Sequence, residues 1–237
     1  VWGLLGTLIW GLIITVIFFV SQIVAMGIYI GINYGDIDAP EIEKQMVDLQ
    51  YNGLVLSICT FASLLVCGLL ILGIIKLKKG VNLKHYLGFR TVSLKDLKFW
   101  LVAFTGLIIV SDLLTFLLGR PIVPEFMTAV YTSIESKWIL WLALIVAAPL
   151  FEEMFFRGFL ISGISPSILG PVGAIVISSA MWAAIHLQYD LYGITTIFIM
   201  GLVLGLARIK TGSTLLTIVL HSFANLVATV EAVIFLS

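Results

Sequence analysis

Seven long apolar runs decide what this chain can fold into, because most of them are long enough to cross a lipid bilayer as a helix. The runs are Trp2–Ile32, Gly53–Ile75, Leu97–Leu118, Trp138–Ile164, Pro171–Leu187, Leu191–Ala207 and Ser213–Phe235. A spanning helix needs about 20 predominantly apolar residues. Lipid offers the backbone no hydrogen bonds, and these continuous runs lack the alternation of barrel strands. The sequence therefore predicts an all-α, polytopic transmembrane bundle of about seven to eight helices.

The composition supports a membrane protein. Of the 237 residues, 61% are hydrophobic and 11% are charged, whereas about a quarter of the residues in soluble domains are charged. A soluble domain of this size could not bury so much apolar surface, which excludes a soluble enzyme, a coiled coil and a disordered protein. The 13 basic and 13 acidic residues give no formal net charge, so we expect membrane lipids as partners and no nucleic acid.

The charged loops between the runs predict the orientation of the chain. Loop 33–52 is acidic, and its carboxylates are Asp36, Asp38, Glu41, Glu43 and Asp48. Loop 76–98 and the short turn 208–212 are rich in lysine and arginine. The positive-inside rule places these two basic segments in the cytoplasm and loop 33–52 outside. We interpret residues 121–136 as an interfacial helix and the whole chain, 1–237, as a single transmembrane domain.

Few ionisable side chains lie within the apolar runs, where each one is expensive and is therefore a candidate for function. They are Asp112, Glu152, Glu153, Arg157, His186, His221 and Glu231, and the amide of Asn225 joins them. We expect Asp112 to pair with a cation such as Arg120 or to lie near the interface. Glu231 lies near the outer end of the last run, and we expect it to reach the lipid headgroups.

The fourth run contains two adjacent carboxylates that a helix places in different surroundings. Glu153 and Arg157 are four residues apart, so they share one face and can form an ion pair. Glu152 points about 100° away from Glu153 and shares its own face with phenylalanines. Glu152 therefore needs a partner from another helix, and such a carboxylate suits a general base. The alternative is that both carboxylates only hold helices together.

Two later runs supply polar pairs at helical spacing. Trp182 and His186 lie on one face of the fifth run, and His221 and Asn225 lie on one face of the seventh. A glutamate and a histidine can share and activate a water, and a histidine and an asparagine can donate hydrogen bonds to an oxyanion. Together with Glu152, these residues predict a site for hydrolysis of an amide by water, built from three helices of the C-terminal half.

The sequence does not support the other intramembrane protease chemistries. It has no H-E-x-x-H zinc motif and no G-x-S-x-G nucleophile motif. Asp112 is the only aspartate within a run, so an aspartyl dyad is absent. Glu152, His186 and His221 could instead ligate zinc, but the asparagine and the arginine-paired glutamate fit an oxyanion site better. We therefore expect no metal or other cofactor, with zinc as the alternative.

The motifs resemble those of the CAAX prenyl endopeptidase and bacteriocin-processing family, also called CPBP or Abi, whose eukaryotic members are type II CAAX prenyl proteases. In chain order they are Glu152-Glu153-x-x-x-Arg157, Trp182-x-x-x-His186 and His221-x-x-x-Asn225. The resemblance covers residues 138–230, whereas residues 1–120 carry no matching motif. The family usually has phenylalanine where this chain has Trp182, which keeps an aromatic wall but changes the shape of the expected substrate groove.

The resemblance implies a glutamate-dependent intramembrane endopeptidase. It implies that Glu152 and His186 activate the water and that His221 and Asn225 stabilise the oxyanion. The paired glutamate and arginine have supporting roles in this scheme. The implied reaction is hydrolysis of a peptide bond in a membrane-associated protein, prenylated or not, or in a small peptide. The alternative is a scaffold or binding protein of the same family that does not cleave peptides.

Two expectations concern the place of the site in the membrane. The membrane is either a bacterial plasma membrane or the endoplasmic reticulum, and we expect the site to open to the cytoplasm. His186 lies at the end of its run, whereas Glu152 lies in the interior of its own. Catalytic groups must lie within a few ångströms of one another. We therefore expect the fifth run either to stop short of a full crossing or to be shifted toward the cytoplasm.

Overall fold

The structure is a computed structural model, and it describes residues 1–35 and 38–236, so Asp36 of the acidic loop lies outside the described residues. The first helices are α1 (Gly3–Tyr34), α2 (Ala39–Leu49), α3 (Gly53–Leu77), α4 (Leu83–Leu87), α5 (Leu94–Leu117) and α6 (Glu125–Thr132). A continuous helix follows, made of α7 (Lys137–Leu142), η1 (Ala143–Ala147), α8 (Ala148–Glu153), η2 (Met154–Leu160) and α9 (Ile161–Ile164). The last are α10 (Gly170–Ala184), α11 (Leu191–Thr211) and α12 (Thr214–Leu236).

Six of the helices in the described part of the chain are long and apolar enough to cross a membrane. They are α1, α3, α5, the continuous helix 137–164, α11 and α12. The expectation of seven spans is wrong at the fifth run, where α10 has 15 residues and a length of about 22 Å. The hydrocarbon core of a bilayer is about 30 Å thick. The prediction of an all-α polytopic bundle is confirmed.

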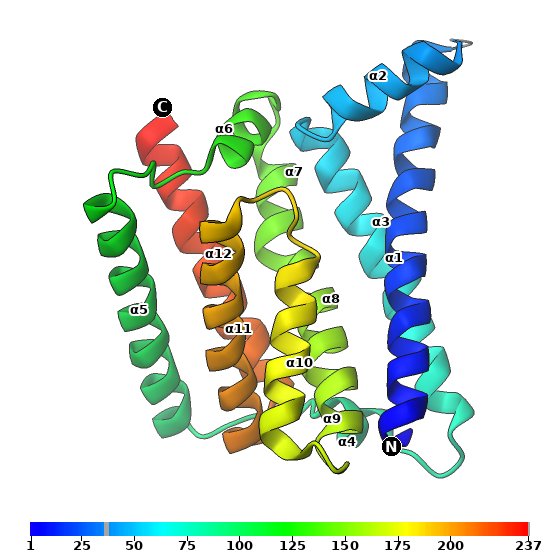
Figure 1. The fold of residues 1–237 in the computed structure, drawn as a ribbon, viewed down its shortest axis with the longest axis vertical. Coiled ribbons are helices and arrows are strands. Elements are labelled where there is room, and N and C mark those ends of the chain that lie inside the picture. Colours follow the sequence, from blue (N-terminus) through cyan, green and yellow to red (C-terminus); the bar gives the residue numbers. More distant parts are fainter. Residues whose placement is uncertain (36–37, 237) are drawn as a thin grey trace.

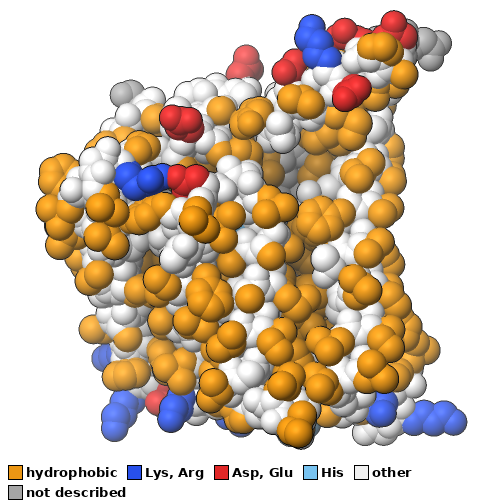
Figure 2. Space-filling view, in the orientation of Figure 1, with side chains coloured by type: hydrophobic (Ala, Val, Ile, Leu, Met, Phe, Trp, Pro, Cys, Tyr) orange, Lys and Arg blue, Asp and Glu red, His pale blue; other side chains and the backbone are white. Residues whose placement is uncertain are grey.

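Acidic and basic loops lie at opposite ends of the bundle. The N-terminus, α4 and α9 lie at one end, and α2, α6 and the C-terminus lie at the other (Figure 1). Figure 2 shows lysine and arginine side chains at the end with α4, which we call the basic end, and carboxylates at the other. The positive-inside rule assigns the basic end to the cytoplasm. This arrangement agrees with the orientation predicted from the sequence.

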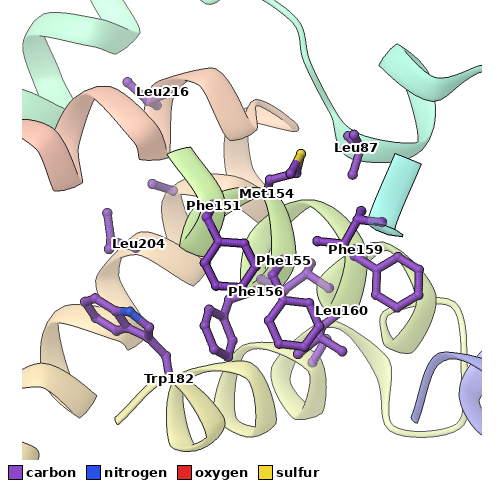
Figure 3. Packing of buried hydrophobic residues seen from close by; sticks show 14 of the residues in the cluster. Leu87, Phe151, Met154, Phe155, Phe156, Phe159, Leu160, Trp182, Leu204 and Leu216 are labelled. Carbon is purple, nitrogen blue, oxygen red and sulfur yellow. The ribbon is translucent and has the colours of Figure 1, made fainter. Parts of the chain in front are cut away.

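The continuous helix Lys137–Ile164, which we call the central helix, is the most buried of the spans. Its phenylalanines gather in the hydrophobic core (Figure 3). The ring of Phe151 stacks on Phe18 of α1 at 5.3 Å between centroids, and the ring of Phe159 stacks on Tyr86 of α4 at 5.8 Å. Such aromatic pairs stabilise packing beyond their buried area, so the central helix is held against both α1 and α4.

The central helix leaves the α-helical hydrogen-bond pattern twice, at the π-helical segments η1 and η2. The Ala148 N–H donates to the carbonyl of Ala143, and the carbonyl of Leu144 thereby loses its α-helical donor. Pro149 would be the π-helical donor to Leu144, but proline has no N–H. Such π-bulges occur frequently at functional sites. The first shift therefore leaves one carbonyl to be satisfied from outside the helix.

The second π-helical segment, η2, also leaves one carbonyl without its α-helical donor. The Ile161 N–H donates to the carbonyl of Phe156, so the carbonyl of Arg157 is skipped. Side chains of two other helices donate to the skipped carbonyls. Asn225 Nδ2 of α12 lies 2.7 Å from the Leu144 oxygen, and Arg208 Nε of α11 lies 3.2 Å from the Arg157 oxygen. Because an unpaired carbonyl in lipid is costly, these contacts bind α11 and α12 to the central helix.

The central helix and α1 make their closest approach at the basic end. Gly163 of α9 faces Thr7 of α1, and both residues are buried. A Cβ atom placed on Gly163 would clash with the Thr7 side chain, and even the Thr7 Cβ would lie only 2.8 Å away. Glycine therefore allows the two helices to touch at a distance that no larger residue permits.

We predict that Gly163→Ala lowers the free energy of unfolding by about 1–3 kcal/mol, because the added methyl group overpacks this contact. Thermal unfolding of the protein in detergent micelles measures the change. Gly73→Ala in α3 is the matched control, since nothing lies within 4 Å of a Cβ placed there. Equal melting temperatures for the two variants would contradict the close contact.

Candidate active site

Trp182, near the end of α10, joins the three helices that carry the predicted site residues. Its indole Nε1–H donates a hydrogen bond to Glu152 Oε2 of the central helix. Its backbone carbonyl lies 2.8 Å from Nδ1 of His186. Its ring contacts the edge of His221 of α12, with 5.1 Å between centroids. The indole is buried, so these contacts form inside the bundle, and the structure brings the three motifs together around one side chain.

The short length of α10 explains how His186 reaches this depth. The helix begins at Gly170 near the basic end and ends at Ala184. Trp182, two residues before that end, contacts Glu152, which lies in the interior of the central helix. With 15 residues, α10 is too short to span the hydrocarbon core, which favours the expectation that the fifth run stops short of a full crossing. The end of α10 therefore lies at the level of the glutamates rather than at the membrane surface.

Glu153, Arg157 and His221 form a buried charged cluster. Glu153 Oε1 lies 2.8 Å from Arg157 Nη1 and 3.0 Å from His221 Nδ1. The side chains of Glu153 and Arg157 are fully buried, and that of His221 is 6% exposed. The predicted ion pair along the central helix is present. The contact between Glu153 and His221 links the central helix to α12, and the sequence reasoning did not identify it.

The guanidinium of Arg157 connects this cluster to two further helices. Its Nη2 donates to the carbonyl of Gly201 in α11 at 3.3 Å. The guanidinium also lies over the ring of Trp182, 4.4 Å from its centroid. A cation over an indole face is a favourable arrangement when water is excluded. Arg157 therefore holds α10 and α11 against the central helix while it neutralises Glu153.

Glu152 has a different environment from its neighbour. It is half-buried, and its hydrogen bond among the described residues is the one from Trp182 to Oε2. No cation lies within ion-pair distance of Glu152 in the described part of the chain. Its Oε1 atom therefore keeps lone pairs for another donor, such as a water or a substrate group.

His186 is held in one orientation by its surroundings. If Nδ1 carries the proton and donates to the Trp182 carbonyl, Nε2 is left as an acceptor. The imidazole stacks on the ring of Tyr189, with 6.3 Å between centroids and 21° between planes. It meets the Trp182 ring edge-on at 5.5 Å. The two aromatic rings fix the plane of the imidazole. In this orientation Nε2 stays available to act as a base or to accept a hydrogen bond.

Tyr189 is a site neighbour that the sequence reasoning missed. It lies in the connection between α10 and α11, and its ring also contacts Phe126 of α6 edge-on at 5.8 Å. Burial raises the pKa of the Tyr189 phenol above its ordinary value, and the nearby negative charge of Glu152 adds to this effect. The phenol therefore stays protonated at neutral pH. The available sequence signal was weak, since it was one aromatic residue between two apolar runs.

The Asn225 side chain forms a hydrogen bond with the backbone of the central helix. Its Nδ2 donates to the skipped carbonyl of Leu144 at 2.7 Å, one turn of α12 beyond His221. The side chain is half-buried. This contact ties the position of α12 to the first π-helical shift, which precedes Glu152 in the central helix by less than two turns. In this geometry Asn225 positions the helix that carries both glutamates.

One expectation about charged residues outside the motifs, the pair of Asp112 and Arg120, is wrong. Arg120 does not pair with Asp112 but forms an ion pair with Asp190, which also caps the N-terminus of α11. Asp112 of α5 instead shares a hydrogen bond with Glu231 of α12. The reason is the packing of α5 against α12, which places the two carboxyl groups together between helices. The expectation that Glu231 reaches the headgroups stays a prediction.

The zinc alternative required a cluster of Glu152, His186 and His221. The described residues contain no group of three or more histidine, cysteine or carboxylate side chains placed to hold a metal ion. His221 directs Nδ1 to Glu153, and His186 directs Nδ1 to a carbonyl. The arrangement suits hydrogen bonding and proton transfer among protein groups.

The two adjacent glutamates should differ in their effect on stability. We predict that Glu153→Gln lowers the free energy of unfolding by about 3–5 kcal/mol, because it leaves the buried Arg157 charge without its partner. Glu152→Gln should cost less than about 1 kcal/mol, since it removes no ion pair and the amide oxygen can still accept from Trp182. Thermal unfolding in detergent micelles compares the two isosteric variants. Equal losses would contradict the division of roles between the glutamates.

The skipped carbonyl of Leu144 gives a second prediction. Asn225→Ala should lower the free energy of unfolding by about 1–3 kcal/mol, because the carbonyl is left without a donor in an apolar environment. Asn33→Ala is the matched control, since Asn33 also donates to a helix carbonyl, that of Tyr29, but is exposed. The control should stay within about 0.5 kcal/mol of the parent protein. Hydrogen exchange at Ala148 and its neighbours would report any local opening at η1.

Comparisons with known proteins agree with the geometry of the site. Residues 134–227 match the family model for type II CAAX prenyl endopeptidase Rce1-like proteins, and this range contains all of the predicted site residues. An uncharacterized 24.3 kDa protein of Escherichia coli is 32% identical over 134 residues, which cover 53% of this chain and 60% of that relative. No solved structure matches the chain. In this integral, multi-pass membrane protein, residues 134–227 are therefore similar to the Rce1-like type II CAAX prenyl endopeptidases, and the chain spans less than two thirds of the relative that it matches.

Proposed function

We propose that the protein is an intramembrane endopeptidase in which Glu152 and His186 activate a water for attack on a peptide bond. The observation that carries this proposal is the pair of contacts at Trp182, which binds Glu152 through its indole and His186 through its carbonyl. Each partner keeps one free atom, Oε1 of the glutamate and Nε2 of the histidine. A water held between a carboxylate and an imidazole can lose its proton as it attacks.

The choice of Glu152 over Glu153 rests on access and charge. Glu153 is fully buried, and its Oε1 already accepts from Arg157 and His221. A carboxylate with these partners is a weak base, because hydrogen bonds and positive charge stabilise its ionised form. Glu152 is half-buried and has no cation partner within ion-pair distance among the described residues. We therefore assign the attacking water to Glu152.

His221 and Asn225 complete the proposed mechanism as groups on the oxyanion side. With a proton on its Nε2, His221 can donate a hydrogen bond to the oxyanion of the tetrahedral intermediate. Asn225 uses one of its two amide hydrogens on Leu144, which leaves the second for the same task. The proton taken from the water returns to the leaving amine through His186. No covalent enzyme intermediate is needed.

The Trp182 indole supplies a hydrogen bond that a phenylalanine at this position could not make. Donation from Nε1 to Oε2 orients the Glu152 carboxylate while Oε1 stays free. Catalytic groups that are held in place in advance lower the entropic cost of the reaction. We propose that Trp182 is a positioning residue for Glu152, besides being a wall of the site.

The proposed substrate is a peptide or protein associated with the membrane. An apolar crevice between α1 and the central helix is lined by Thr15, Phe18, Phe151, Phe155, Phe156 and Ile185, and the last of these precedes His186. Figure 2 shows the molecule hollowed along the face between α1 and α10. The crevice holds about 10 Å³, so a lipid chain on the substrate would fit there only if α1 and the central helix moved apart. Opening of the site to the cytoplasm stays a prediction.

Peptide cleavage by the purified protein in detergent tests the proposal. We predict that Glu152→Gln and His186→Ala each lower kcat by about 10²- to 10⁴-fold, because each removes a group that moves the proton. Glu135→Gln is the matched control, since Glu135 is an exposed glutamate in the loop before α7. Prenylated and unprenylated forms of one peptide would identify the preferred substrate class.

Several outcomes would contradict the proposed mechanism. Full activity of the Glu152→Gln variant would remove the general base. Loss of activity on treatment with a chelator, with recovery on adding zinc, would favour the alternative in which Glu152, His186 and His221 bind a metal. Absence of cleavage of any peptide, together with stable co-purification of a membrane protein, would favour a scaffold of the same family.

A further inference from the structure

A cavity of about 620 Å³ lies at the basic end, away from the candidate active site. It is formed by α4 and the turn after it, by the region around α9, and by the C-terminal end of α11. Its polar lining includes Asn82, Lys84, His85, Arg90, Ser162 and Arg208. None of the residues that line this cavity is an aspartate or a glutamate. We call it the basic cavity.

Arg208 is the buried member of this lining, with 9% of its surface exposed. Its Nε donates to the carbonyl of Arg157 and to Thr214 Oγ1, and its Nη2 donates to Ser162 Oγ at 3.1 Å. All three acceptors are neutral. No carboxylate lies within ion-pair distance of Arg208 in the described part of the chain. The positive charge is therefore removed from water without a counter-ion, which is unfavourable.

A second guanidinium lies close to the first, and no carboxylate lies within ion-pair distance of it among the described residues. Arg90 donates through Nε to the carbonyl of Thr211 at 2.9 Å, at the C-terminal end of α11. The structure brings the two arginines together by means of glycine. A Cβ atom on Gly88 would lie 2.5 Å from Arg208 Nη2, and a Cβ atom on Gly212 would clash with the guanidinium of Arg90. The adjacent charges repel each other, and Lys84 adds a third.

The hydrogen bonds to carbonyls and the positive-inside rule explain only part of this arrangement. Satisfying the skipped carbonyl of Arg157 requires an N–H donor but no charge. A topological signal requires basic residues in a loop, whereas Arg208 is buried in a helix. Nη1 of Arg208 has no hydrogen-bond partner among the described residues, and its burial is incomplete. An anion in the basic cavity would neutralise the two guanidinium groups and accept from the free donors.

We propose that the basic cavity binds a phosphate group, supplied by the headgroup of an anionic phospholipid or by free phosphate. Arginine presents a planar fork of donors that matches phosphate oxygens. Basic cavities between transmembrane helices on the cytoplasmic side are places where phospholipid headgroups bind. The site is independent of the proposed peptidase activity. It reaches the central helix through Arg208, which connects the anion to the carbonyl of Arg157.

The experiment measures thermal unfolding of the full chain in two media. In uncharged detergent micelles, inorganic phosphate replaces chloride at constant ionic strength. In nanodiscs, phosphatidylcholine is compared with a mixture that contains phosphatidylglycerol. We expect the melting temperature to rise with inorganic phosphate or with the anionic lipid, because a ligand that binds only the folded state stabilises it. A rise in micelles identifies free phosphate as sufficient, and a rise only in nanodiscs identifies the lipid headgroup. No rise in either medium would overturn the proposal.

Exposed residues provide variants that keep the fold. Lys84→Gln and Arg90→Gln should each weaken binding about tenfold, as expected for loss of a charge-assisted hydrogen bond. Lys98→Gln is the matched control, because Lys98 is exposed near the start of α5, in the same basic segment 76–98, but does not line the cavity. The control should keep the affinity of the parent protein. If Lys98→Gln weakened binding as much as Lys84→Gln, the anion would be held by the charge of the whole surface, and the proposed site would be refuted.

Discussion

The buried contacts of Glu153 are the interaction on which the rest of the C-terminal half depends. A carboxylate within a membrane helix is tolerated only when other groups neutralise it. Arg157 does so along the same helix, and His221 contacts the same carboxylate oxygen from α12. Arg157 then reaches Gly201 of α11 and the ring of Trp182. One charge in the central helix therefore requires three other helices to stand at fixed positions. Those positions are also the ones that place Glu152 and His186 on either side of Trp182.

The two π-helical segments of the central helix also fix the positions of neighbouring helices. Each π-helical segment leaves one carbonyl without a backbone donor, and lipid cannot replace that donor. Asn225 satisfies the first carbonyl, and Arg208 satisfies the second. The first contact lies beside the candidate active site and the second beside the basic cavity. The irregular backbone of the central helix thus links the two polar regions of the protein. Each region contains a hydrogen bond to a carbonyl that would otherwise have no donor in an apolar environment.

Local spacing predicted part of the site well. Glu153 and Arg157 pair because four residues make about one turn of a helix, and the motif pairs in α10 and α12 follow the same rule. Contacts between helices were not predictable in this way. The partner of Glu152 is an indole, His221 binds Glu153, and Tyr189 covers His186. The expected pair of Asp112 and Arg120 was wrong, because each residue met a closer partner from another segment. Such pairings depend on how helices pack, and residue spacing along one helix contains no information about them.

The amino-acid sequence by itself determined that the chain is a helical membrane protein, which end of it is basic, and which side chains are available for catalysis. These properties follow from apolar content, loop charge and residue type, all of which can be read without coordinates. The tertiary structure decided that α10 ends at the level of Glu152, and that the three motifs converge on Trp182. It also decided where the carbonyls skipped by the central helix find their donors. The reason is that hydropathy reports only how strongly each segment prefers lipid. Where a helix ends and which helices it contacts depend on the partners that buried charges and unpaired backbone groups find in other helices.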